Sequence, residues 1–74
     1  MNGSMDMMVV PHDDGAVEVF APGQLPAGAV AVNARFIKVS GPGLVAAPNG
    51  KLTAEQYQDW VSGLQAQGYH VTPR

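Results

Sequence analysis

The chain has no cysteine, few charged residues and no long apolar run, and each of these shortages excludes a class of protein. Without cysteine, neither a disulfide nor a thiolate metal site can support the fold. No run approaches the roughly 18 apolar residues that a transmembrane helix needs, and the N-terminus lacks the basic and apolar regions of a secretory signal. We therefore expect a cytoplasmic protein without a membrane partner, and a place within a viral particle stays open.

The size and charge of the chain favour a protein that is completed by a partner. Only 14% of its 74 residues are charged, against about 25% in ordinary domains, so much of its surface is neutral or apolar. A domain this small buries only about 60% of the surface that its unfolded chain exposes. We expect a protein partner or self-association to add stability. The net charge of −2 gives no support to nucleic-acid binding.

A helix with both ends marked is the clearest feature of the sequence. Thr53 and Gln56 have the spacing of a capping box, in which each side chain accepts a hydrogen bond from the other residue's backbone N–H. Gly68 stands where a left-handed residue commonly follows a helix. Between these ends the large apolar residues share one helical face: Tyr57, Trp60, Val61 and Leu64. The pattern predicts an amphipathic helix over about residues 54–67.

Strands are predicted mainly before this helix. Short alternating or apolar runs predict strands at Met7–Val10, Ala16–Phe20, Ala29–Ser40 and Tyr69–Thr72. Residues 12–15 predict a turn, so the first two runs form a hairpin. The apolar phase of the third run changes near Asn33 and Ala34, which indicates a bulge or a bend. Residues 44–47 are either a brief strand or a packed loop, and residues 48–51 predict a turn.

The order of these elements predicts an α+β fold. Strands that come first, followed by one late helix, are typical of a small, mostly antiparallel sheet with the helix packed on one face. We expect three to five short strands, the last of them C-terminal to the helix and returning beside an earlier strand. Residues 1–5 are predicted to be a flexible lead, and residues 6–74 a single domain.

One polar cluster has the composition of a metal or catalytic site. His12, Asp13 and Asp14 offer the ligand types of a small metal-binding or hydrolytic module. Consecutive residues on one turn rarely converge on a single ion, so a plain turn is the preferred interpretation. His70 has no accompanying nucleophile motif and is predicted to be a surface histidine. We expect no catalytic residue, no bound metal and no cofactor, and hence no enzyme.

Aromatic and basic side chains are the better candidates for a binding surface. The candidate interaction residues are Tyr57, Trp60, Phe36, Arg35 and Lys38. Tyr57 and Trp60 share the apolar face of the helix, so core packing is the first interpretation for both. Because both residue types are also frequent anchors of interfaces, it stays open whether Trp60 belongs to the core or to an interface.

The charges divide the chain into unlike parts. The first eighteen residues contain four acids, whereas residues 19–54 contain three basic residues and no acid. Folding can bring the two parts together as weak exposed ion pairs. Alternatively, the chain carries a dipolar surface that docks head-to-tail on copies or partners.

These observations favour a non-enzymatic protein–protein interaction module. We expect a small structural or accessory subunit of a larger assembly, a viral particle being one such assembly. A small inhibitor or modulator of a single target protein is an alternative, and a metal-binding or hydrolytic module using His12, Asp13 and Asp14 is another. In the interaction hypotheses, an edge strand at residues 37–39 or 69–72 can accept a strand from a partner.

Overall fold

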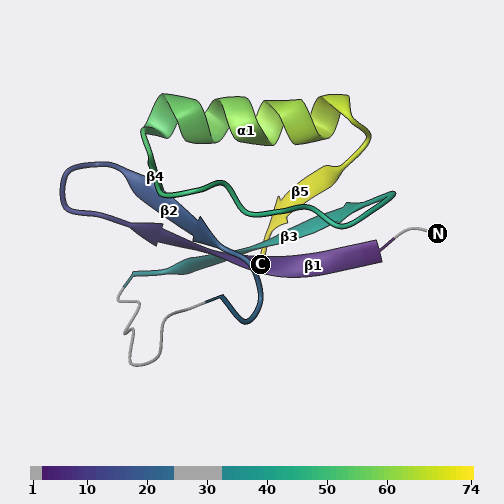
Figure 1. Cartoon of the computed structure of the whole chain (residues 1–74), viewed down its shortest axis with the longest axis horizontal. Helices are drawn as coiled ribbons and strands as arrows, with labels where there is room; N and C mark the ends of the chain where they lie inside the picture. The colour runs from purple at the N-terminus through teal and green to yellow at the C-terminus, as the bar shows by residue number, and fades with distance from the viewer. Residues whose placement is uncertain (1–2, 25–32) are drawn as a thin grey trace.

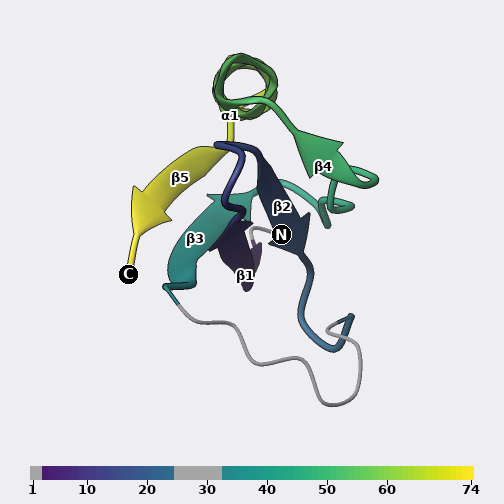
Figure 2. The same cartoon turned by 90° about the vertical axis from the view of Figure 1, so that its left-hand side faces the viewer.

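The computed structural model describes residues 3–24 and 33–74, and this part of the chain contains five strands and one helix. In chain order they are β1 (Gly3–Pro11), β2 (Val17–Phe20), β3 (Arg35–Gly41), β4 (Lys51–Leu52), α1 (Ala54–Ala66) and β5 (His70–Pro73). The strands pair antiparallel in the order β4-β2-β1-β3-β5, and α1 lies over one face of the sheet (Figures 1 and 2). This arrangement confirms the predicted α+β class.

The central strands take their faces from strict alternation along the chain. Met7 and Val9 of β1 face α1 and are both 0% exposed, whereas Met8 between them faces the other side. On β3, Ile37 and Val39 are buried beside them, and Ile37 lies opposite Met7. The helix-facing side of the sheet is therefore a continuous apolar layer.

The predicted hairpin is present. β1 and β2 pair from Met8 opposite Phe20 to Pro11 opposite Val17. In the turn between them, the backbone N–H of His12 donates to the carbonyl of Ala16 at 2.8 Å. The hairpin places the polar residues of the turn at one end of the sheet.

The N-terminal end of β1 differs from the sequence-based expectation. Residues 1–5 are predicted to be a flexible lead, but residues 3–5 continue β1 and pair with residues 39–41 of β3. Met5 is half-buried and packs against the core. This part of the strand is held by a distant segment, which a local pattern cannot reveal. Residues 1–2 lie outside the described residues.

Two segments around β3 and β4 also differ. β3 begins at Arg35, directly after the bend predicted at residues 33–34, and Asn33 has a left-handed φ of 66° that interrupts an extended run. The earlier part of the predicted strand, residues 29–32, lies outside the described residues. Residues 44–47 form a loop and no strand. Lys51, predicted as part of a turn, instead belongs to β4, which pairs with β2.

The helix begins and ends as the sequence predicts. The backbone N–H of Gln56 donates to Oγ1 of Thr53 at 3.0 Å, and that of Thr53 donates to Oε1 of Gln56 at 2.9 Å. At the other end Gly68 has a φ of 94°, and the backbone N–H of Tyr69 donates to the carbonyl of Leu64 at 3.0 Å. That second pattern is a Schellman ending, which turns the chain sharply into β5.

The core lies between α1 and the sheet. Its buried members are Met7, Val9, Val19, Ile37, Val39 and Leu64. Leu64 comes from the helix, and Tyr57 and Trp60 are half-buried and pack against this cluster. The packing of Trp60 on the core supports the first of its two interpretations without excluding contact with a partner.

Candidate interaction site

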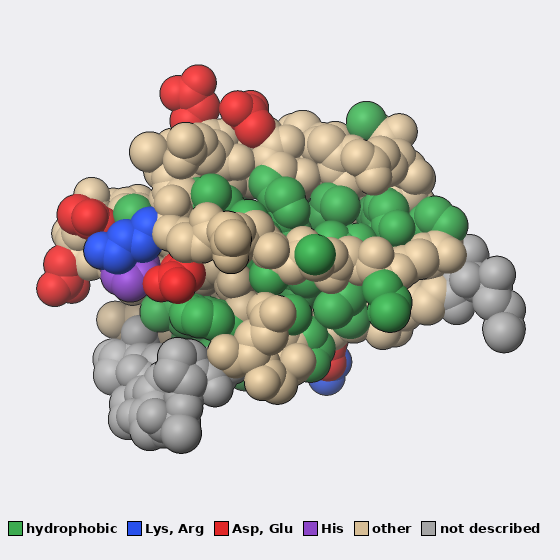
Figure 3. Space-filling model, viewed as in Figure 1, with side chains coloured by type: hydrophobic (Ala, Val, Ile, Leu, Met, Phe, Trp, Pro, Cys, Tyr) green, Lys and Arg blue, Asp and Glu red, His purple; other side chains and the backbone are tan. Residues whose placement is uncertain are grey.

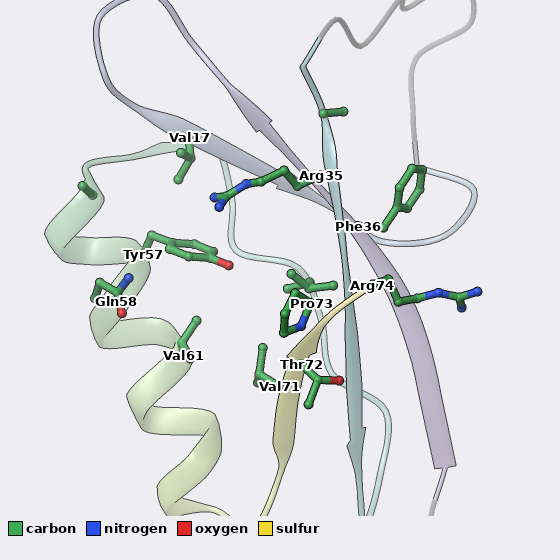
Figure 4. A pocket seen from close by; sticks show the side chains of 13 residues that line it. Val17, Arg35, Phe36, Tyr57, Gln58, Val61, Val71, Thr72, Pro73 and Arg74 are labelled. Carbon is green, nitrogen blue, oxygen red and sulfur yellow. The ribbon is translucent and has the colours of Figure 1, made fainter.

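A groove opens between the N-terminal half of α1 and the end of β5, with a volume of about 630 Å³. Its lining includes Val17, Arg35, Tyr57, Val61, Val71 and Pro73, which come from four different elements (Figure 4). At this end β3 begins with Arg35, two residues before Ile37, which lies opposite Pro73 of β5. The groove therefore lies beside the last paired residues of β3 and β5.

The walls of the groove are mainly apolar. Tyr57 and Val61 come from α1. Val17 comes from β2 and Val71 from β5, two strands that lie on opposite sides of the central pair β1 and β3. All four are half-buried, so each keeps part of its apolar surface open. The ring of Tyr57 lies 6.0 Å from that of Trp60, which supports its position on the helix. A side chain entering the groove would bury apolar surface on both sides.

Arg35 is the charged exception on this face. It precedes Ile37 by two residues and so shares the side of β3 that faces α1. Figure 4 shows its side chain directed into the space between α1 and the sheet, whereas Phe36 lies on the other side of β3. The ion pairs found in residues 3–24 and 33–74 join other groups, so within that part of the chain no carboxylate neutralises Arg35.

The free edge of β5 borders the groove and has few hydrogen-bonding groups to offer. The backbone N–H of Arg74 donates to the carbonyl of Phe36 at 3.0 Å. The residues that form backbone hydrogen bonds with β3 are therefore Arg74 and, at every second position before it, Thr72 and His70. Antiparallel pairs alternate, so the N–H and C=O of Val71 point away from β3, toward the free edge of the sheet. Pro73 has the same orientation but no N–H. Only Val71 can offer both a donor and an acceptor to another strand.

The structure brings together some of the predicted interaction residues and separates others. Tyr57 and Arg35 both direct their side chains into the groove. Phe36 points to the opposite face and is 53% exposed. Lys38 also lies on that face, opposite Asp6 of β1. Trp60 lies beside a second hollow at the C-terminal half of α1.

That second hollow includes Gly63, whose place within a helix the sequence does not explain. Apart from its two chain neighbours and the backbone of the helix itself, no atom of the described residues lies within 4 Å of where its Cβ would be. Leu44, which also lines this hollow, is 92% exposed. Figure 3 shows apolar side chains gathered below α1. The packing of the described residues therefore gives no reason for a glycine here.

Sequence reasoning missed an apolar cluster on the sheet face away from α1. Met8 lies opposite Phe20 on one side and Phe36 on the other. The alternation of the three strands contains the signal, but it becomes readable only when the pairing register is known. Because residues 25–32, which join β2 to β3 in the chain, lie outside the described part, we assign no partner to this cluster.

In the turn that contains His12, Asp13 and Asp14, the side chains of His12 and Asp14 form local hydrogen bonds. Nε2 of His12 lies 3.1 Å from Oε1 of Glu18 on β2. Within residues 3–24 and 33–74, no three metal-ligating side chains are close enough to share an ion. His70 lies opposite Ser40, at the other end of the sheet from the turn. The fold therefore does not bring the two histidines together.

Asp14 has a pH-dependent role in this turn. The backbone N–H of Ala16 donates to its Oδ1 at 3.0 Å and holds the pKa of this carboxyl below its usual 3.8. The folded state therefore binds fewer protons than the unfolded state. The stabilisation that ionised Asp14 gives the folded state is complete well above the usual pKa and is lost as the pH falls through 3.8 and below.

We expect the parent chain to lose more stability on acidification than an Asp14→Asn variant, which keeps a side-chain acceptor but has no proton to gain. Urea unfolding of both chains at about pH 6 and about pH 3 measures this difference. A carboxyl titration of Asp14 by NMR gives the direct check. A midpoint at or above 3.8 would contradict the assigned role of the Ala16 hydrogen bond.

Comparison with known proteins adds no relative. No protein-family model, no curated protein and no solved structure matches the chain. In the described residues, no helix has the length and the apolar character that crossing a membrane requires. The fold and the groove therefore define the class: a small α+β domain with an open, mainly apolar groove beside an edge strand.

Proposed function

We propose that the protein is a non-enzymatic protein–protein interaction module and that it binds an extended segment of a partner chain in the groove. The observation that carries the proposal is the position of the free β5 edge, which borders apolar walls from α1. An extended chain can pair with such an edge through its backbone and place a side chain in the groove. In this function the chain is a small accessory subunit of a larger assembly.

The strand order selects one of the two predicted edges. Residues 37–39 belong to β3, which is paired on both sides by β1 and β5, so they cannot accept another strand. Residues 69–72 overlap β5, which is paired on one side only. The partner strand is therefore expected at β5, where Val71 offers its N–H and C=O.

A Val71→Pro variant tests this function because it removes the outward N–H and leaves the bonds from β5 to β3 in place. The probe is a phage-displayed library of random peptides selected against the immobilised full chain. We expect selected peptides to bind Val71→Pro at least about tenfold more weakly than the parent, because a donor is lost and the ring obstructs pairing. Binding is measured by fluorescence anisotropy with synthetic copies of the peptides.

Val71→Ile is the matched control. Isoleucine keeps the backbone N–H, the β-branched shape and the apolar character of the side chain, so its affinity is expected to stay close to that of the parent. Far-UV circular dichroism verifies that both variants retain α1. Peptides that bind Val71→Pro as tightly as the parent would contradict pairing at this edge, and a library without any specific binder would contradict the function.

A further inference from the structure

We infer that the groove recognises the C-terminus of its partner: the terminal carboxylate pairs with Arg35, and the last side chain, an apolar one, lies against Tyr57. This inference rests on the proposed function and specifies its ligand. Three features of the groove support it. Pro73 has no backbone N–H to donate, Arg35 is a charged residue on an apolar face, and both residues lie at the same end of the groove.

The first feature is the limited edge of β5. A partner strand finds one donor and one acceptor at Val71, and the next outward residue, Pro73, has no N–H. A strand that continued alongside Pro73 would leave a carbonyl without its donor, at a cost of about 1–3 kcal/mol if that carbonyl is buried. A partner that ends at this point avoids that cost.

The second feature is the charge of Arg35. Its guanidinium lies on the helix-facing side of β3. The other side chains that β1, β2 and β3 place on this face are apolar. Arginine presents paired N–H donors that match the two oxygens of a carboxylate. The ion pairs of the described residues leave this guanidinium to a ligand, whereas they join Arg74 to Asp6.

The third feature is the direction that the first two impose. Arg35 lies two residues along β3 from Ile37, the partner of Pro73, in the direction away from Val71. A ligand whose terminal carboxylate reaches Arg35 therefore runs parallel to β5, and its final residue lies beside Pro73 with the carboxylate directed toward Arg35. The last side chain then meets Tyr57, Val61 and Val17, whose apolar surfaces are half open.

Two matched heptapeptide libraries test the inference, one made as free acids and the other as C-terminal amides. Both carry an N-terminal fluorophore and randomised final positions, and their binding to the full chain is measured by fluorescence anisotropy. We expect the best ligands to be free acids with an apolar last residue. Their amides are expected to bind at least about tenfold more weakly, the loss typical of a charge-assisted pair.

Variants at Arg35 assign the effect to this residue. In Arg35→Gln the free acid and the amide are expected to bind equally, and Arg35→Lys is expected to recover part of the difference because it restores the charge without the planar group. Lys38→Gln is the control on the opposite face and should leave the difference unchanged. If Arg35→Gln retains the preference for free acids, the assignment to Arg35 is wrong.

The remaining outcomes separate this inference from the proposed function. Acid and amide ligands that bind equally, but lose affinity in Val71→Pro, would overturn recognition of the C-terminus and leave the interaction module intact. The same conclusion follows if amides with an internal Asp or Glu bind as well as free acids. If neither library contains a ligand for the parent chain, both the inference and the function fail.

Discussion

Replacing Leu64 with alanine is expected to lower the free energy of unfolding by about 3 kcal/mol, within the range of large-to-small core changes. Leu64 is 6% exposed and is the helix residue that belongs to the buried core. A chain of this length has a total stability of only about 4–11 kcal/mol. The substitution should therefore remove a large part of the force that holds α1 on the sheet, and with it one wall of the groove.

Urea unfolding followed by circular dichroism measures this effect. Val61→Ala is the comparison on the same helical face, and its loss should be smaller because Val61 is only half-buried. Gln65→Ala changes an exposed neighbour and is expected to alter stability by no more than about 0.5 kcal/mol. A loss below about 1 kcal/mol for Leu64→Ala would show that α1 is not seated on the core as described.

Replacing Gly41 with alanine is expected to destabilise the fold by about 2–3 kcal/mol, because the new methyl group would overlap Tyr69. An ideal Cβ at Gly41 would lie 2.1 Å from Cδ1 and 2.7 Å from Cγ of the Tyr69 ring. The ring cannot move away freely, since the backbone N–H of Tyr69 is bonded to Leu64 at the end of α1. The melting temperature should fall by roughly 10–20 °C.

Gly63→Ala provides the matched control, since it makes the same chemical change in open space. It is expected to stabilise the isolated chain by up to about 1 kcal/mol, the usual preference of a helix for alanine over glycine. In a Tyr69→Val background, Gly41→Ala should cost much less than in the parent, because the overlapping ring is gone. An equal cost in both backgrounds would refute the close approach of Gly41 and Tyr69.

The edges of the sheet limit how copies of this chain can associate with each other. Two β5 strands paired antiparallel about Val71 would place Pro73 of one copy opposite Tyr69 of the other. Pro73 has no N–H, and the N–H of Tyr69 is already bonded to Leu64. At the other edge, β4 is two residues long. Extended pairing between copies is therefore disfavoured, which is a common protection of edge strands.

The same features favour a different kind of partner over a second copy. A ligand that ends beside Pro73 requires no donor from it, and its terminal charge complements Arg35. In the proposed complex, the groove would combine a short backbone contact with one apolar side chain and one charge. Because each contribution is modest, specificity for the chain end would depend on all three acting together.

Part of the candidate site could be predicted from the sequence. Tyr57 was identifiable as a possible anchor because helical periodicity placed it on the apolar face. Arg35 was identifiable only as a basic residue on a strand, since its position on the helix-facing side depends on where β3 begins. Asn33, with its left-handed backbone, sets that starting point, and the phase change at residues 33–34 indicated it only as a bend.

The sequence alone determined the elements whose hydrogen bonds close within a few residues. The capping box of Thr53 and Gln56, the ending at Gly68 and the hairpin of β1 and β2 are all local, so their signals survive in the order of residues. Tertiary structure decided the rest: which strands are edges, which register they adopt and which side chains meet in the groove. Those outcomes depend on contacts between residues far apart in the sequence, such as Gly3 with Gly41 and Ile37 with Pro73, whose free energies no local pattern contains.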